Sequence, residues 1–196
     1  MRNARNTRFA VLFALLLACT SLAAAPELSR PLVLVAKPEL QDPLYGKTVL
    51  VVAPFGKDQH VGFIINRPTD FTLAKVFPEH GPSKKVLDPV FLGGPVDANA
   101  IFALVRQADS PGGNSLQIMP GLFAAIDAPT VDKIIEAHPK EARFVAGLVV
   151  WRPGELRHEV DLGAWHVMDS DPALATRNPE GLWEDLVQRM RSRLAI

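Results

Sequence analysis

The densest group of potentially reactive side chains lies between two tryptophans, Trp151 and Trp165. The intervening segment carries Arg152, Glu155, Arg157, His158, Glu159 and Asp161. One interpretation is a polar binding site rimmed by aromatic rings, with Trp151, Glu155, His158, Glu159 and Trp165 as its contacts. The other is a solvated helix face whose flanking tryptophans fill the core, which is the usual place for large aromatics near a strand end. We favour burial of both tryptophans.

The pair His158-Glu159 invites comparison with a zinc site, but the spacing is wrong. A metalloprotease helix needs a second histidine four residues after the first, and position 162 is Leu162. We therefore expect no metal and no cofactor. The sequence also lacks GxSxG, Walker A and GxGxxG motifs, so we assign no catalytic residue. A hydrolase whose site is assembled by the fold, with His158, Glu159 and Asp161 as candidates, remains an alternative.

Two turn-like segments offer further candidate contacts. The apolar run "VGFII" ends in Asn66-Arg67-Pro68, where Asn66 can bond its own backbone and Pro68 stops the strand. Arg67 then emerges near the sheet edge, free to bind a carboxylate or a carbonyl. In "LGGPV", Gly93 and Gly94 indicate a strand bend with unusual φ angles. Close approach of a ligand or partner to these two glycines is the alternative.

Apolar runs rich in β-branched residues predict strands at 32–36, 48–53, 60–66, 89–96, 100–107, 116–119 and 142–151. A polar turn joins the second run to the third, and a Gly-Gly turn separates 100–107 from 116–119, so we predict two antiparallel hairpins. Helices are expected at 72–77 and at 129–138, and a short helix or an extended turn is expected at 154–161. The mixture predicts a single α+β domain with a mixed or antiparallel sheet.

The C-terminal segment gives the clearest helix signal. We expect Asn178 to cap the helix and Pro179 to be its first residue. An apolar stripe then follows at helical spacing, made of Leu182, Trp183, Leu186, Val187, Met190 and Leu194.

The N-terminus resembles an export signal. Three arginines precede an apolar run from Phe9 to Cys19, and small residues follow. We predict a signal peptide at 1–23, which leaves Ala24 as the first mature residue. The alternative is a lipoprotein signal at 1–18 with lipidation of Cys19, the one cysteine of the chain. Both place the protein in the periplasm or on the outer membrane of a Gram-negative bacterium, with membrane contact only through such an anchor.

The mature charge argues against nucleic-acid binding. Removing residues 1–23 takes three of the 21 Lys and Arg and none of the 21 Asp and Glu, which leaves a formal charge of −3. A nucleic-acid-binding domain usually carries a basic patch. We therefore expect a protein or small-molecule partner in the envelope and no nucleic acid.

Several segments together resemble the YqgE/AlgH (UPF0301) family of bacterial proteins. They are "LVAKPELQDPLYGKTVLVV", "VGFIINRP", "FLGGPV" and "GLVVWRPGELRHEVDLGAW", and the resemblance covers about residues 31–190 within a domain at 31–196. It implies a bulged, strongly bent, barrel-like sheet flanked by helices, and no known reaction. The family name implies a regulator of transcription as an alternative function.

This sequence departs from the family pattern at polar positions. The second strand reads "VVAPFG" without the family's histidine, and Leu104 is followed by Val105 where a histidine is common. Gly147-Leu148-Val149-Val150-Trp151 and Gly154-Glu155-Leu156-Arg157 replace more polar family segments. Turn residues are kept, so we expect a retained scaffold with an altered site. The resulting hypothesis is a non-enzymatic binding, scaffold or regulatory protein of the envelope.

Overall fold

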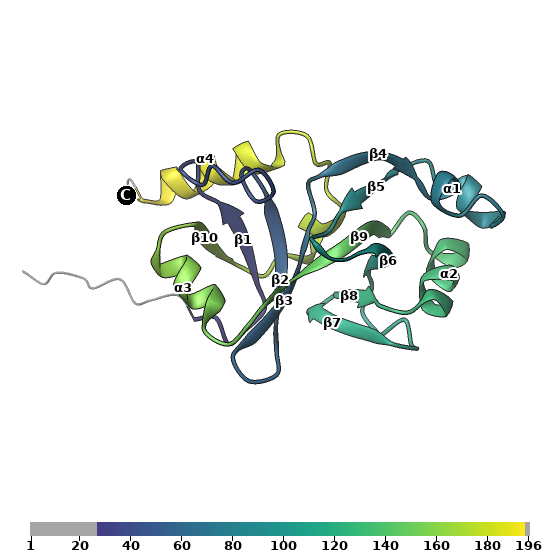
Figure 1. Ribbon diagram of the computed structural model, residues 1–196, viewed down its shortest axis with the longest axis horizontal. Helices are drawn as coiled ribbons and strands as arrows, with labels where there is room; N and C mark the ends of the chain where they lie inside the picture. Colours follow the sequence, from purple (N-terminus) through teal and green to yellow (C-terminus); the bar gives the residue numbers. More distant parts are fainter. Residues whose placement is uncertain (1–26, 195–196) are drawn as a thin grey trace, which may run out of the picture.

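A computed structural model describes residues 27–194, so both signal-peptide hypotheses and Cys19 lie outside the described residues. All ten strands belong to one strongly curled sheet, with the order β10-β1-β2-β3-β9-β6-β8-β7 and with β4 and β5 beside it (Figure 1). The strands are β1 Leu32–Ala36, β2 Val49–Phe55, β3 Gln59–Ile64, β4 Pro68–Thr72, β5 Pro89–Leu92, β6 Val96–Arg106, β7 Ser115–Met119, β8 Leu122–Ala125, β9 Ala142–Trp151 and β10 Trp165–Asp169.

Four α-helices and two 3₁₀ helices accompany the sheet. They are α1 Leu73–Val76, α2 Ala128–Ala137, α3 Glu155–Asp161 and α4 Leu182–Leu194, with η1 Pro82–Lys85 and η2 Pro172–Thr176. Helices α3 and α4 lie at one end of the molecule, and α1 and α2 lie at the other (Figure 1). The predicted α+β class and bent sheet are confirmed. No helix within residues 27–194 is long and apolar enough to span a bilayer.

The central strands are mostly apolar because both faces of the sheet are largely covered. In β1, Val33 and Val35 face the concave interior, whereas Leu34 faces the opposite core, and all three side chains are fully buried. In β6, Leu104 and Val105 divide in the same way between two cores. This two-sided burial explains why the sequence shows continuous apolar runs with little alternation.

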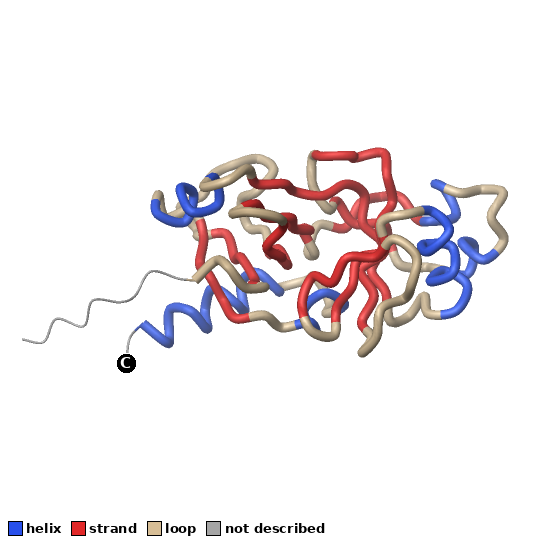
Figure 2. The backbone as a smooth tube through the Cα atoms, turned by 90° about the horizontal axis from the view of Figure 1, so that it is seen from below, coloured by secondary structure: helices blue, strands red, loops and turns tan. Residues whose placement is uncertain are grey.

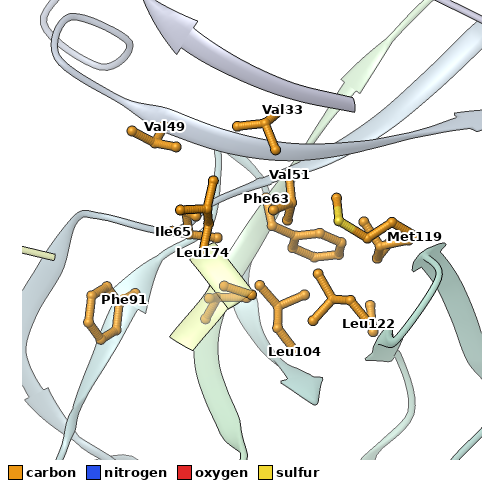
Figure 3. Close-up of a cluster of buried hydrophobic side chains, with 14 of the residues drawn as sticks. Val33, Val49, Val51, Phe63, Ile65, Phe91, Leu104, Met119, Leu122 and Leu174 are labelled. Atoms are coloured by element: carbon orange, nitrogen blue, oxygen red, sulfur yellow. The ribbon is translucent and has the colours of Figure 1, made fainter. Parts of the chain in front are cut away.

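The concave face of the half-barrel forms the largest core. Phe63, Leu104 and Leu122 extend into it from three strands (Figure 3). Helix α4, which leads to the C-terminus, lies beside the curled strands (Figure 2). Leu174 of η2 and Leu186 of α4 are buried against these strands. Leu182, Leu186 and Val187 of the predicted stripe therefore cover the half-barrel.

The sheet is antiparallel apart from one pair. Strand β5 runs parallel to β9, with Phe91 opposite Val145 and Leu92 opposite Ala146. The pairing between β6 and β9 shifts register between Val96 and Ile101, so this long strand is bulged. The predicted hairpin of β2 and β3 is confirmed.

The predicted hairpin of 100–107 with 116–119 is wrong. Strand β6 pairs with β8, an additional short strand, and β7 pairs on the far side of β8. The turn from β7 to β8 is Pro120-Gly121, in which Gly121 adopts a positive φ of 81°. This tight turn lets a four-residue strand fold back directly and displaces β7 to the sheet edge.

The start of the C-terminal helix also differs from the prediction. Helix α4 begins at Leu182, directly after Gly181, which has a φ of 67°. The Asn178 side chain accepts a hydrogen bond from the Glu180 backbone N–H at 3.1 Å. Asn178 therefore forms a local turn before the helix, a common use of this side chain, and does not cap α4.

The Gly93-Gly94 segment crosses β9 at backbone contact distance. Gly93 N–H donates to Ala146 at 2.7 Å, and Ile64 N–H donates to Gly93 at 2.9 Å. A Cβ atom on Gly93 would lie 2.2 Å from the carbonyl oxygen of Gly147, and one on Gly94 would lie 2.3 Å from Leu148. Neither glycine has the positive φ that we expected. Glycine is required at both positions because a side chain would collide with the backbone of β9. The close approach is made by the chain's own strand.

Gly93→Ala is expected to lower the free energy of unfolding by more than about 4 kcal/mol, or to prevent folding, since two backbones would have to separate. The matched control is Gly81→Ala, because a Cβ there meets nothing within 4 Å and Gly81 has helical dihedral angles. We expect that control to change stability by less than about 1 kcal/mol. Urea denaturation measures the free energy of unfolding of both variants. Equal losses in the two variants would contradict the close contact between Gly93 and the backbone of β9.

Candidate functional site

A carboxylate holds the two tryptophans of the predicted site together. Trp151 ends β9, Trp165 begins β10, and Glu159 lies on α3 between them. One oxygen of Glu159, Oε2, accepts the indole N–H of Trp151 at 3.0 Å and that of Trp165 at 2.7 Å. Both indoles are buried, with 2% and 4% exposure. The expected burial of the tryptophans is confirmed, and Glu159 supplies the acceptor that each buried indole needs.

Tyr45 completes this cluster. Its ring meets the edge of Trp165 at a centroid distance of 6.1 Å and an interplanar angle of 79°. Burial raises the pKa of Tyr45, and the carboxylates of Glu159, Asp42 and Glu155 raise it further. The phenol is therefore neutral at pH 7.

The remaining predicted contacts of this segment lie on the outer side of α3. His158 and Asp161 are exposed, and Glu155 accepts the backbone N–H of Arg152 at 2.8 Å. The structure thus brings Trp151, Glu159 and Trp165 together and separates them from the solvent-facing His158. Within residues 27–194, no group of three or more His, Cys, Asp or Glu is placed to hold a metal ion.

Asn66 connects two strands at their ends. Its Oδ1 accepts the Val49 N–H at 2.8 Å, and its Nδ2 donates to the Lys47 carbonyl at 2.9 Å. The side chain therefore continues the ladder of β3 and β2 by one residue, whereas we expected it to bond its own turn. Arg67 donates through Nη2 to the Gly46 carbonyl at 2.6 Å, so the half-buried guanidinium lies against the same loop.

A cavity of about 300 Å³ lies beside Arg143 of β9, a charged residue that no sequence motif indicates. Its guanidinium lies 4.1 Å from the centre of the Phe91 ring. It donates to the carbonyls of Ile65 and of Arg177. Only 8% of Arg143 is exposed. Burial lowers the pKa of Arg143 to about 10, against the opposing effect of Asp88, so the group stays charged at neutral pH.

The sequence contained a signal for this cavity. "ARFVAGLVVW" is the longest predicted strand within residues 27–194, and Arg143 is the one charged residue inside it. A charge within a strand that is buried on both faces needs a special environment. Phe91 and Arg177 provide part of that environment. Both are distant from Arg143 in the sequence, so the sequence alone could not identify them as its neighbours.

Glu159→Ala is expected to lower the free energy of unfolding by about 2–5 kcal/mol, because two buried indole N–H groups lose their acceptor. Glu159→Gln keeps an acceptor oxygen and should cost less. Asp161→Ala, an exposed carboxylate on the same helix, is the control and should cost less than about 0.5 kcal/mol. Equal losses for Asp161→Ala and Glu159→Ala in urea denaturation would show that the two indole hydrogen bonds to Glu159 do not stabilise the fold.

Asn66→Asp should destabilise the fold by about 1–3 kcal/mol at pH 7, because the new carboxylate would face the Lys47 carbonyl without a proton to donate. The folded state would therefore favour the neutral carboxyl, so the deficit should shrink as the pH falls to about 4. Asn99→Ala, at an exposed position of β6, is the control. A pH-independent deficit in thermal unfolding would refute the proposed Nδ2 bond.

Comparison with known proteins agrees with this architecture. The pattern of the AlgH-like family matches residues 33–195. A UPF0301 protein of Thermobifida fusca is 31% identical over 173 residues, covering 83% of this chain and 87% of that protein. A UPF0301 protein of Streptomyces coelicolor is 29% identical over 171 residues, with the same coverage.

Two solved structures share the fold. The solution structure of AlgH from Pseudomonas aeruginosa has a TM-score of 0.69 at 23% identity, covering 88% of this chain and 92% of that one. A crystal structure from Corynebacterium diphtheriae also has a TM-score of 0.69, at 21% identity, covering 85% and 89% of the two chains. With the family pattern matched over nearly all the described residues, the chain belongs to the AlgH-like family.

Proposed function

We propose that this chain is a non-enzymatic binding protein of the bacterial cell envelope and that its ligand or partner enters the cavity beside Arg143. The observation that carries the proposal is a preformed cavity with a fixed, buried positive charge at its wall. Binding sites are commonly preformed hollows with a few oriented polar groups. Two backbone carbonyls and the Phe91 ring hold the guanidinium in place before any ligand arrives.

Binding accounts for the polar side chains better than catalysis does. Glu159 already accepts two indole N–H groups through Oε2, so this oxygen supports the two tryptophans. Asn66 has its amide oxygen and nitrogen both bonded to the backbone of the 47–49 segment. These groups support the fold, and the cavity beside Arg143 lies elsewhere on β9.

The N-terminal sequence supports work in the envelope. Arg2, Arg5 and Arg8 precede the apolar run that ends at Cys19, and this pattern is typical of exported chains. Cleavage before Ala24 gives a free periplasmic protein, and lipidation of Cys19 gives an anchored one.

Residues 1–30 fused to a reporter that is active only in the periplasm should give reporter activity, because the basic and apolar regions direct export. The control fusion starts at residue 27 and should be inactive. The intact mass of the mature protein then separates an Ala24 start from a lipidated Cys19, and Cys19→Ser should change the mass only in the second case. Full-length, uncleaved protein in the cytosol would overturn the envelope assignment and favour a regulator inside the cell.

The binding role is tested by capture from envelope fractions. Wild-type protein should retain a partner or small molecule that Arg143→Met does not, because that substitution removes the charge and keeps most of the side-chain volume. Arg152→Met, at an exposed arginine outside the cavity, is the control and should behave like wild type. Equal recovery with all three proteins would contradict a role for the cavity.

A further inference from the structure

Only some of the N–H groups of the Arg143 guanidinium donate hydrogen bonds within the described residues. It carries five N–H groups, and two of them donate to the carbonyls of Ile65 and Arg177. The other three make no hydrogen bond to the part of the chain that the structure describes. Arg143 is only 8% exposed, so solvent reaches these donors over a small area. A ligand with acceptor oxygens would complete them.

The charge at the cavity is uncompensated at close range. Among residues 27–194, no carboxylate lies within 4 Å of the Arg143 guanidinium. The cavity lining also includes Lys140, an exposed cation, and Asn178, whose amide nitrogen can donate. Asp88, also exposed, is the one acidic residue of the lining. The balance favours a single negative charge, because Asp88 would repel a doubly charged group more strongly.

Thr176 adds a hydroxyl to the lining, and the other lining residues are apolar. Phe91 and Phe144 contribute aromatic rings, and Pro89, Ala142 and Pro179 contribute aliphatic surface. A volume of about 300 Å³ is at the small end of ligand pockets. The lining therefore matches an anionic head joined to a small apolar body.

We propose that the cavity beside Arg143 binds a carboxylate attached to a small apolar group. The planar guanidinium presents paired N–H donors that fit the two oxygens of a carboxylate. The source is either a free monocarboxylic acid or the C-terminal residue of a peptide with an apolar side chain. This inference rests on the proposed function and gives the chemical class of its ligand.

The first experiment titrates the full mature protein with benzoate and with benzamide at pH 7, followed by calorimetry or NMR. Benzoate should bind saturably, and benzamide, which lacks the charge, should bind about tenfold or more weakly. A peptide that ends in leucine, with a free or an amidated C-terminus, distinguishes the two sources. Binding of the free peptide but not the amidated one identifies chain termini, and binding of benzoate alone identifies free acids.

Variants at the cavity rim keep the test independent of folding. Arg143→Met should weaken benzoate binding by about tenfold or more. Lys140→Gln should weaken it, and Asp88→Asn should tighten it, each by about twofold to fivefold, since both residues are exposed charges. Arg152→Met should leave it unchanged. Opposite shifts from two exposed rim residues require charge recognition in this cavity.

Three results would overturn the inference: no binding of benzoate or of the free peptide, equal binding of benzoate and benzamide, or rim variants without effect. None of them bears on the export fusion or on capture from envelope fractions, so the proposed function can stand when the carboxylate assignment fails. Conversely, if the protein binds carboxylates but is found in the cytosol, the carboxylate ligand is supported and the location in the envelope is refuted.

Discussion

In the middle of the sheet, the backbone at Gly93 and Gly94 lies against the backbone of β9 at Gly147 and Leu148. Gly93 forms hydrogen bonds on both sides, to Ala146 of β9 and to Ile64 of β3. Strands β3 and β9 pair directly near Trp151 and then diverge. Gly93 lies between them where they diverge and bonds to both. The strong curl of the sheet depends on this contact, because two strands could not turn apart there without leaving buried backbone groups unpaired.

Strand β9 links the cavity beside Arg143 to the tryptophan cluster. Near its start, Arg143 borders the cavity, and at its end Trp151 joins the carboxylate-bridged cluster. Between them lies Gly147, whose φ of 75° fits the crossing. The strand pairs with β3, β5 and β6, so it is held along its whole length. Side chains on such a strand keep their positions, which is what a preformed binding site requires.

The sequence predicted the fold class and most elements because the central strands are buried on both faces. Apolar runs such as 32–36 and 142–151 then stand out without reference to partners. Strand β8 was missed because a four-residue run beside a Pro-Gly turn gives little periodic signal. The start of α4 was misplaced because Asn178 and Pro179 have the residue types of a cap but form a preceding turn.

The candidate site was less predictable, because its residues depend on contacts between distant segments. Glu159 was selected for its charge, yet its partners are two indoles that the fold brings to it. The Gly-Gly pair predicts unusual φ angles at Gly93 and Gly94, but the actual constraint is the passage of strand β9. Arg143 is meaningful only beside Phe91 and Arg177, and no local pattern places these three residues together.

The cover of the half-barrel has a consequence for the order of folding. Leu174, Leu186 and the rest of η2 and α4 follow all ten strands in the chain, so the ribosome makes them after the strands they cover. Until then the concave face of the sheet has no protein surface to pack against, and its apolar side chains stay accessible to water or to a chaperone. Folding of this domain is therefore completed only after synthesis has passed the last strand.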